Sequence, residues 1–197
     1  MENQKIFELE LILKKIPGFS KKQIQKIIDY LINSNKQEID SLINAIQDFK
    51  ENINKCEYCN NLLAYVKDCI ICNDKNRDKK LLVVEQYRDI EKFEDLKIFN
   101  GYYFVLEGLY KLKNNDQNIL NNIDKLLKII DKYDEIILGL SATLEAQFCM
   151  QYLQKYIKSK YPKANVYQLS MGIPLGASVE YVDSITLKQS LINKLKM

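Results

Sequence analysis

Four of the five cysteines lie close together in the sequence, in two pairs with two residues inside each pair. Cys56 and Cys59 form the first pair, and Cys69 and Cys72 form the second. Two thiolates from each pair can meet at one ion, and four thiolates close a tetrahedral structural site that leaves no open position for catalysis. We therefore predict that these residues bind one Zn²⁺ ion; an iron–sulfur cluster and paired redox thiols are the alternatives. Because the loop between the pairs has few apolar residues, the ion is expected to supply much of its folding free energy.

A second candidate site is a short turn between two helical segments, with the sequence Ile16-Pro17-Gly18-Phe19-Ser20. Lys22 and Lys26 follow it four residues apart, so they share one face of the second helix. Backbone N–H groups at a helix start, together with the helix dipole, bind a phosphate oxygen without reading base sequence. The pattern resembles the helix-hairpin-helix motif, with Gly18 in the turn and Ser20 where a second glycine is usual. We predict DNA binding at Gly18, Lys22 and Lys26; a plain helix turn with solvated lysines is the alternative.

The composition excludes several kinds of chemistry. Histidine is absent, so catalysis by imidazole, histidine-activated nucleophiles and imidazole metal sites are all ruled out. The formal net charge of +3 neither requires nor excludes a polyanionic partner. Among 29 basic residues only Arg77 and Arg88 are arginine, which argues against sequence-specific reading of guanine. The sequence has no apolar run of about 18 residues and no secretory signal, so we expect a cytoplasmic protein with no membrane partner.

Apolar spacing divides the chain into a helical N-terminal part and a mixed part. Helices are predicted up to Ile16, over 21–31 and over 37–53, and the last should turn five residues inward: Ile39, Leu42, Ile43, Ile46 and Phe49. The polar run 73–80 should be an exposed link. After it, short apolar runs predict strands at 81–84, 102–106, 135–138 and 165–169, with helices between them and a last helix over 186–195. Strands that alternate with helices predict a mostly parallel α/β sheet.

The mixed part could be a Toprim domain, whose catalytic members hold Mg²⁺ with a glutamate after the first strand and Asp-x-Asp after the third. Glu85 follows the first predicted strand, but Ser141 and Thr143 occupy the two aspartate positions. Two neutral oxygens cannot replace two carboxylates in a phosphoryl-transfer metal site. We therefore predict that the protein is not an enzyme, and a Toprim nuclease or primase is the disfavoured alternative. Glu85 could equally be a surface or capping carboxylate.

Three further features leave more than one interpretation open. No acidic residue lies between Glu145 and Glu180, whereas four lysines do: Lys155, Lys158, Lys160 and Lys163. These lysines form either a phosphate-facing patch or a solvated helix end. The loop 172–176 and the acids after it could belong to a self-association arm or to a Walker B element. Cys149 is expected to pack as a small core side chain.

The order of these pieces resembles the bacterial recombination mediator family RecR over nearly the whole chain. The resemblance rests on Ile16-Pro17-Gly18, the four paired cysteines, Val83-Val84-Glu85, Gly101-Tyr102 with Val105-Leu106, and Gly172-Ile173-Pro174-Leu175-Gly176 with Glu180-Tyr181 and Asp183. The chain departs from the family pattern at Ser20, Phe104, Gln168 and Met171.

The resemblance implies an α/β protein with an N-terminal all-α helix-hairpin-helix region, a small zinc module, and a Toprim-like, mostly parallel sheet flanked by helices. Residues 1–55 correspond to the helix-hairpin-helix domain, 56–76 to the four-cysteine module, 81–165 to the Toprim-like domain, and 166–197 to a C-terminal loop and helix.

The resemblance also implies a role in DNA repair by binding rather than by catalysis. Members form a dimeric or tetrameric ring that clamps single- or double-stranded DNA without sequence preference. With RecO- and RecF-type partners they load RecA onto gapped or single-stranded DNA, which places them at the nucleoid. Glu145 matches a family residue implicated in partner contact. A zinc adaptor that binds only protein is a further alternative.

Overall fold

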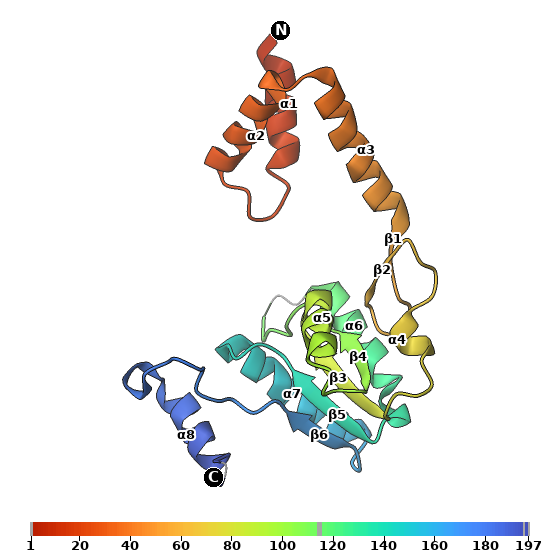
Figure 1. Ribbon diagram of the computed structural model, residues 1–197, viewed down its shortest axis with the longest axis vertical. Helices are drawn as coiled ribbons and strands as arrows, with labels where there is room; N and C mark the ends of the chain where they lie inside the picture. The colour runs from red at the N-terminus through yellow and green to blue at the C-terminus, as the bar shows by residue number, and fades with distance from the viewer. Residues whose placement is uncertain (1, 114–115, 195, 197) are drawn as a thin grey trace. The chain divides into compact units, whose positions relative to one another are not determined.

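The computed structural model describes residues 2–113, 116–194 and 196. The chain divides into two compact units, Met1–Ile53 and Asn54–Met197 (Figure 1). The first unit is helical, and the second contains the cysteines and the parallel sheet. Among the residues described, no helix has the length and apolar character that crossing a membrane requires.

Three helices make up the first unit: α1 (Glu2–Leu13), α2 (Lys21–Asn33) and α3 (Lys36–Asn52). Ser20 caps α2, because its hydroxyl accepts a hydrogen bond from the Gln23 N–H at 3.3 Å while the Gln23 side chain accepts one from the Ser20 N–H at 2.7 Å. This reciprocal capping satisfies two N–H groups at the start of the helix. The buried residues of α2 are Ile24 and Ile28.

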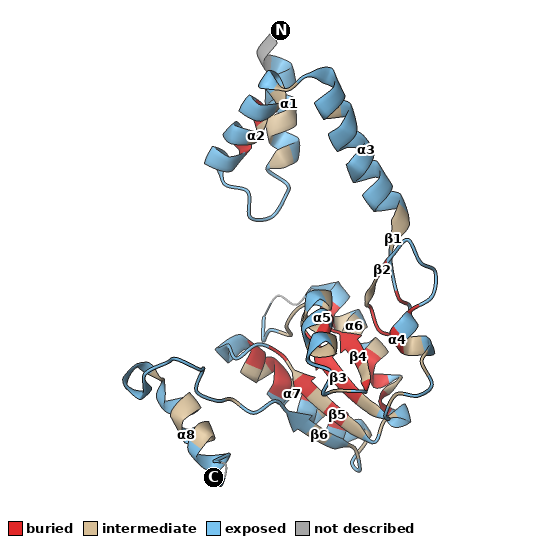
Figure 2. Ribbon diagram, viewed as in Figure 1, coloured by how far each residue is buried: buried red, intermediate tan, exposed pale blue. Residues whose placement is uncertain are grey.

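The prediction that α3 turns its apolar residues inward is wrong. None of the residues of α3 is buried, and its apolar stripe is largely open to solvent (Figure 2). Ile46 and Phe49 are 60% and 59% exposed. The spacing does form an amphipathic helix, but periodicity does not say which surface covers the apolar side. The described part of this unit does not bury that side.

The second unit is built on a four-stranded sheet of β3 (Lys80–Val84), β4 (Tyr102–Val105), β5 (Glu135–Gly139) and β6 (Asn165–Gln168). The strand order is β4-β3-β5-β6, and all three pairings are parallel, as predicted. The connecting helices are α5 (Tyr87–Leu96), α6 (Gln117–Leu127) and α7 (Leu144–Lys160), with a 3-10 turn, η1, at Ile130–Lys132.

Successive residues of β3 enter two different cores, because side chains alternate across a strand. Leu81 and Val83 pack in a cluster with residues of α6 and α7, and this cluster includes Cys149, which is fully buried. Leu82 and Val84 pack in a second cluster with α5 and the cysteine module. The sheet is therefore covered on both faces, as its continuous apolar strands indicate.

The cysteine module consists of β1 (Ile53–Lys55) paired with β2 (Leu62–Ala64), and the short helix α4 (Ile70–Asn73). Sequence analysis found neither of these three-residue strands. At the other end of the unit, η2 (Val179–Tyr181) and α8 (Ser184–Ile192) contain no buried residue.

The polar run 73–80 is not simply an exposed link, because Arg77 is folded into the unit. Its side chain is 11% exposed, and its guanidinium binds both carboxylate oxygens of Glu94 at 2.8 and 2.7 Å. Glu94 also accepts a hydrogen bond from the Tyr103 hydroxyl at 2.6 Å. One of the two arginines thus fastens the segment after the cysteines to the sheet and to α5. Composition alone could not separate this arginine from the solvated residues around it.

Candidate functional site

The four paired cysteines meet at one point. Their sulfur atoms all lie within 4.8 Å of one another, and Cys56, Cys59 and Cys69 are buried. The Sγ atoms of Cys56 and Cys72 are 3.8 Å apart, as are those of Cys59 and Cys69. A tetrahedral ion with bonds of about 2.3 Å to sulfur separates its ligands by about 3.8 Å. The donors therefore have the type and spacing that one tetrahedral metal ion requires.

The thiols also influence one another's ionisation. The hydrogen bond with Cys69, together with burial, raises the pKa of Cys59, whereas the same hydrogen bond lowers the pKa of Cys69. Four thiolates at this spacing would repel one another strongly without a cation. A divalent ion would remove this penalty, and its binding would release protons.

Asn60, directly after Cys59, anchors the metal-binding loop to the sheet. It is 5% exposed and has a positive φ of 60°, a conformation that asparagine tolerates better than most residues. Its amide donates to the Val105 carbonyl at 2.9 Å and to the Asn122 side chain at 3.1 Å, and its own oxygen accepts from Lys125 at 2.5 Å. The Cys59 carbonyl adds a backbone hydrogen bond from the Val105 N–H at 2.8 Å. These hydrogen bonds join the loop to the Toprim-like unit, so the loop is not an independent module. Sequence analysis did not predict these contacts.

The hairpin before α2 places its predicted binding residues on the surface. Gly18 has a φ of +86°, and no atom lies within 4 Å of the position that a Cβ would take. Lys22 and Lys26 are exposed on α2. The structure gives no hydrogen-bond partner among the described residues for the backbone N–H groups of Lys21 and Lys22. Two backbone donors and two ammonium groups are therefore available to an anion.

At the carboxyl edge of the sheet, two of the three predicted Toprim positions, Glu85 and Ser141, are in contact, and of the three only Glu85 has a carboxylate. Glu85 follows β3 and Ser141 follows β5, and the Ser141 hydroxyl donates to the Glu85 carboxylate at 2.7 Å. Thr143 is the N-cap of α7 and accepts a hydrogen bond from the Ala146 N–H at 3.2 Å. Glu145 lies exposed in the first turn of the same helix. Both neutral residues at the aspartate positions therefore have a structural partner.

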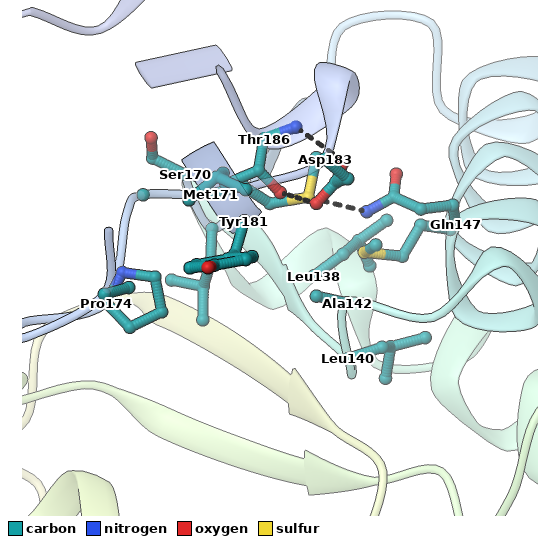
Figure 3. A pocket seen from close by; sticks show the side chains of 15 residues that line it. Leu138, Leu140, Ala142, Gln147, Ser170, Met171, Pro174, Tyr181, Asp183 and Thr186 are labelled. Atoms are coloured by element: carbon teal, nitrogen blue, oxygen red, sulfur yellow. Dashed lines mark hydrogen bonds between the residues drawn. The ribbon is translucent and has the colours of Figure 1, made fainter. Parts of the chain in front are cut away.

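A pocket of about 530 Å³ opens beside this edge, between α7 and the segment that follows β6 (Figure 3). Leu138, Leu140 and Pro174 give it apolar walls, while the Gln147 amide faces the Met171 sulfur at 3.9 Å. Asp183 caps α8, and the Thr186 hydroxyl and the backbone N–H groups of Ile185 and Thr186 lower its pKa. The carboxylate is thus used by its own helix, which gives no support to the Walker B alternative.

Comparison with known proteins identifies the relatives of this chain. The family model described as Toprim domain matches residues 79–169, and the model described as RecR, C-terminal matches residues 172–194.

Whole-chain relatives agree with these two models. The chain is 37% identical over 195 residues to Recombination protein RecR of Mycoplasmopsis pulmonis, covering 98% of this chain and 100% of the relative. It is 34% identical to the protein of that name from Ureaplasma urealyticum, over 94% and 92% of the two chains. The corresponding protein of Lactobacillus johnsonii is 33% identical, over 90% and 89% of the two chains. The chain therefore belongs to the RecR family of recombination proteins, and its role lies in DNA recombination and repair.

Proposed function

We propose that the protein is a DNA-binding mediator without catalytic activity, which forms a ring-shaped clamp and works with RecO- and RecF-type partners to load RecA onto gapped or single-stranded DNA. The observation that carries this proposal is the sheet edge, where Ser141 binds Glu85 in place of a second metal-binding carboxylate. A phosphoryl-transfer site needs several carboxylates around its metal ions. The Toprim fold then serves as a scaffold, and the protein acts at nucleoid DNA in the cytoplasm.

The DNA contact in this proposal is the hairpin with Gly18, Lys22 and Lys26. Free backbone N–H groups and lysine ammonium groups bind phosphates and carry no base preference. Affinity then depends on counterion release and falls steeply with salt. The contact is therefore independent of sequence and open to single- and double-stranded DNA.

The four-cysteine module binds zinc in this proposal and has a structural role. All four donors are protein thiolates, so no position is left for water or substrate. Cys56, Cys59 and Cys69 lie in the cluster that covers one face of the sheet. The ion would hold that side of the core together and, through the neighbouring Asn60, keep the loop on β4 and α6.

Self-association accounts for the exposed stripe of α3. A helix with apolar residues along one side is stable in water when another surface covers that side. A second copy of the chain is the partner that ring formation supplies. Glu145, exposed in the first turn of α7, is the proposed contact for a partner of the RecO type.

The experiment that tests this function is fluorescence anisotropy with labelled single-stranded and gapped DNA at two salt concentrations, with and without a RecO-type partner. Salt-sensitive binding that the partner strengthens, with no cleavage in Mg²⁺, is expected. Cleavage or primer synthesis in Mg²⁺ would contradict the non-catalytic assignment. Absence of binding in every condition would favour an adaptor that contacts protein only.

A further inference from the structure

The strand β6 forms one edge of the parallel sheet and pairs with β5 alone among the described strands. Its residues are exposed or half-buried rather than buried, and Tyr167 is 52% exposed. An edge strand presents backbone groups that another extended chain can pair with. The edge therefore has the properties of a docking site for a further strand.

The hydrogen-bond pattern indicates which backbone groups of β6 point outward. The Leu169 N–H, just after the strand, donates to the Leu138 carbonyl of β5 at 3.2 Å. In a parallel sheet the backbone N–H and C=O groups of one residue point to one neighbouring strand, and those of the next residue point to the other side. The backbone groups of Tyr167, two residues before Leu169, therefore also point to β5. The N–H and C=O groups of Val166 and Gln168 then face the open edge.

A small cavity lies between α7 and this edge. It has a volume of about 130 Å³ and is lined by Leu138, Met150, Gln151, Gln154, Val166 and the segment that follows it. An apolar cavity of about 150 Å³ holds a benzene molecule, so this space can take one aliphatic side chain. Gln151 and Gln154 add amide groups that can donate to and accept from a peptide. Domains that bind peptides as an added strand use such an exposed sheet edge for backbone pairing and adjacent pockets for alternate side chains.

The charged side chains between Glu145 and Glu180 are all basic. No acid lies between Glu145 and Glu180, while Lys155 and Lys158 are exposed on α7. Lys155 lies four residues after Gln151, and Lys158 lies four residues after Gln154, so these lysines continue the helix surface that borders the cavity. An occupant with carboxylates is therefore favoured over a neutral or basic one.

We propose that the groove between α7 and β6 binds an extended acidic segment of a partner protein, which adds as a strand to the edge of β6. Backbone pairing with Val166 and Gln168 requires peptide N–H and C=O groups, and a nucleic acid cannot supply both in a strand repeat. The cavity takes one apolar side chain of the segment, and Lys155 and Lys158 bind its carboxylates. This surface is distinct from the hairpin proposed for DNA.

The test uses a fluorescent ten-residue peptide of alternating valine and glutamate, titrated with the full chain and followed by anisotropy. Saturable binding that weakens with salt is expected, with no binding of the alternating valine–lysine peptide. The double variant Lys155→Gln with Lys158→Gln should weaken binding about five- to tenfold. The matched control, Lys92→Gln on α5 with Lys97→Gln at the C-cap of that helix, removes two charges elsewhere and should leave the affinity unchanged.

A backbone variant tests the strand geometry separately from the charge. Val166→Pro removes an N–H that faces the open edge and leaves the donors to β5 in place, a position where edge strands tolerate proline. It should weaken the peptide by about tenfold while circular dichroism and the melting temperature stay close to the native values. If Val166→Pro unfolds the protein, the lysine pair still decides the proposal.

Three results would overturn the proposal. The first is absence of binding by the acidic peptide, and the second is equal binding by both peptides. The third is loss of oligo-dT binding in the Lys155 and Lys158 double variant with peptide affinity unchanged, which would assign this surface to nucleic acid.

Discussion

The Ser141 hydroxyl donates a hydrogen bond to the Glu85 carboxylate across the ends of two neighbouring parallel strands, with 2.7 Å between the oxygen atoms. This is the edge at which open α/β sheets bind ligands. A neutral donor here satisfies the glutamate without introducing a second negative charge. The glutamate of a Toprim metal site is thus retained at Glu85, whereas the two partner positions, Ser141 and Thr143, have no carboxylate.

The first prediction restores that chemistry. Ser141→Asp with Thr143→Asp restores carboxylates at both Toprim aspartate positions, the first of them in contact with Glu85, and aspartate is also a good N-cap for α7. We expect the double variant to bind Mg²⁺ at least about tenfold more tightly than the native chain, because two more oxygen ligands with negative charge are available. Isothermal titration with Mg²⁺ measures this. Ser141→Asn with Thr143→Asn is the uncharged control, and equal affinity in all three proteins would contradict the assignment of this edge.

The second prediction concerns pH and the metal. Since the pKa of Cys59 is raised, its thiol carries a proton at neutral pH when no ion is present, and the ion must displace that proton. Zinc affinity should therefore rise with pH, and binding should release protons into a weakly buffered solution. Competition with a chromogenic chelator at pH 6.0 and 7.5, with one Zn²⁺ per chain at saturation, checks both points.

Removing the metal should loosen the core as well as the loop. Because Cys56, Cys59 and Cys69 share a cluster with the sheet, chelation is expected to lower the melting temperature of the whole second unit. Cys149→Ala provides a control, since that buried thiol lies in the other cluster and should not change the zinc content. A chelated protein with unchanged melting temperature would contradict the structural role of the ion.

The third prediction concerns the pair of Arg77 and Glu94. The guanidinium lowers the pKa of Glu94, so this group contributes stability above the pKa that its carboxyl has in the unfolded chain, and the contribution is lost as pH falls through the lower folded pKa. Arg77→Ala should reduce the free energy of unfolding by about 2 kcal/mol at pH 7, less than the 3–5 kcal/mol of a fully buried pair because Glu94 is partly exposed.

Urea unfolding of three proteins separates charge from geometry at this pair. Arg77→Lys keeps the charge but cannot bind both carboxylate oxygens in parallel, so it should recover only part of the loss. At acidic pH, once Glu94 is protonated, the difference between native chain and Arg77→Ala should shrink. A difference that does not depend on pH would attribute the effect of Arg77 to packing and to its hydrogen bond with Gly101.

The fourth prediction tests the hairpin. Lys22→Gln with Lys26→Gln removes two proposed phosphate contacts, so affinity for single-stranded DNA should fall and the salt slope should decrease by about 1.4. Affinity for different base sequences should fall equally. Lys36→Gln with Lys50→Gln, on α3 of the same unit, is the matched control. A native salt slope in the Lys22 and Lys26 variant would contradict the assignment of DNA binding to this face.

Local patterns predicted much of the fold correctly. The apolar runs at 81–84 and 135–138 gave two strands of the sheet, because buried parallel strands have continuous apolar sequence. The spacing of the cysteines indicated their convergence, since a tetrahedral site needs ligands in close pairs. Ser20 lies directly before a predicted helix, a place typical of an N-cap, and the structure shows that it caps α2.

Features that depend on distant partners could not be predicted. Asn60 and Arg77 look like solvated polar residues in the sequence, and only the fold brings Val105 and Glu94 beside them. The contact between Ser141 and Glu85 joins residues 56 positions apart, and it could be anticipated only through the Toprim pattern, not from local spacing. Even so, an asparagine directly after a Cys-x2-Cys pair is a usable signal, because such a tight turn often needs a residue that tolerates positive φ. The exposed side of α3 shows the same limit, because apolar spacing predicts an amphipathic helix but does not say what surface covers it.

The last prediction concerns that side of α3. If a second copy covers the stripe, Ile46→Glu with Phe49→Glu should lower the oligomer mass, because two charges would enter an apolar interface. Both side chains are largely exposed, so the helix itself should fold normally. Light scattering after size exclusion measures the mass, and Leu96→Glu with Ile98→Glu changes two similarly exposed residues of the second unit as a control. A native chain that stays monomeric at high concentration, or a variant of unchanged mass, would show that self-association does not use α3. Reduced mass together with weaker DNA binding would instead tie the clamp to this helix, because a ring that opens loses the contacts of its other subunits.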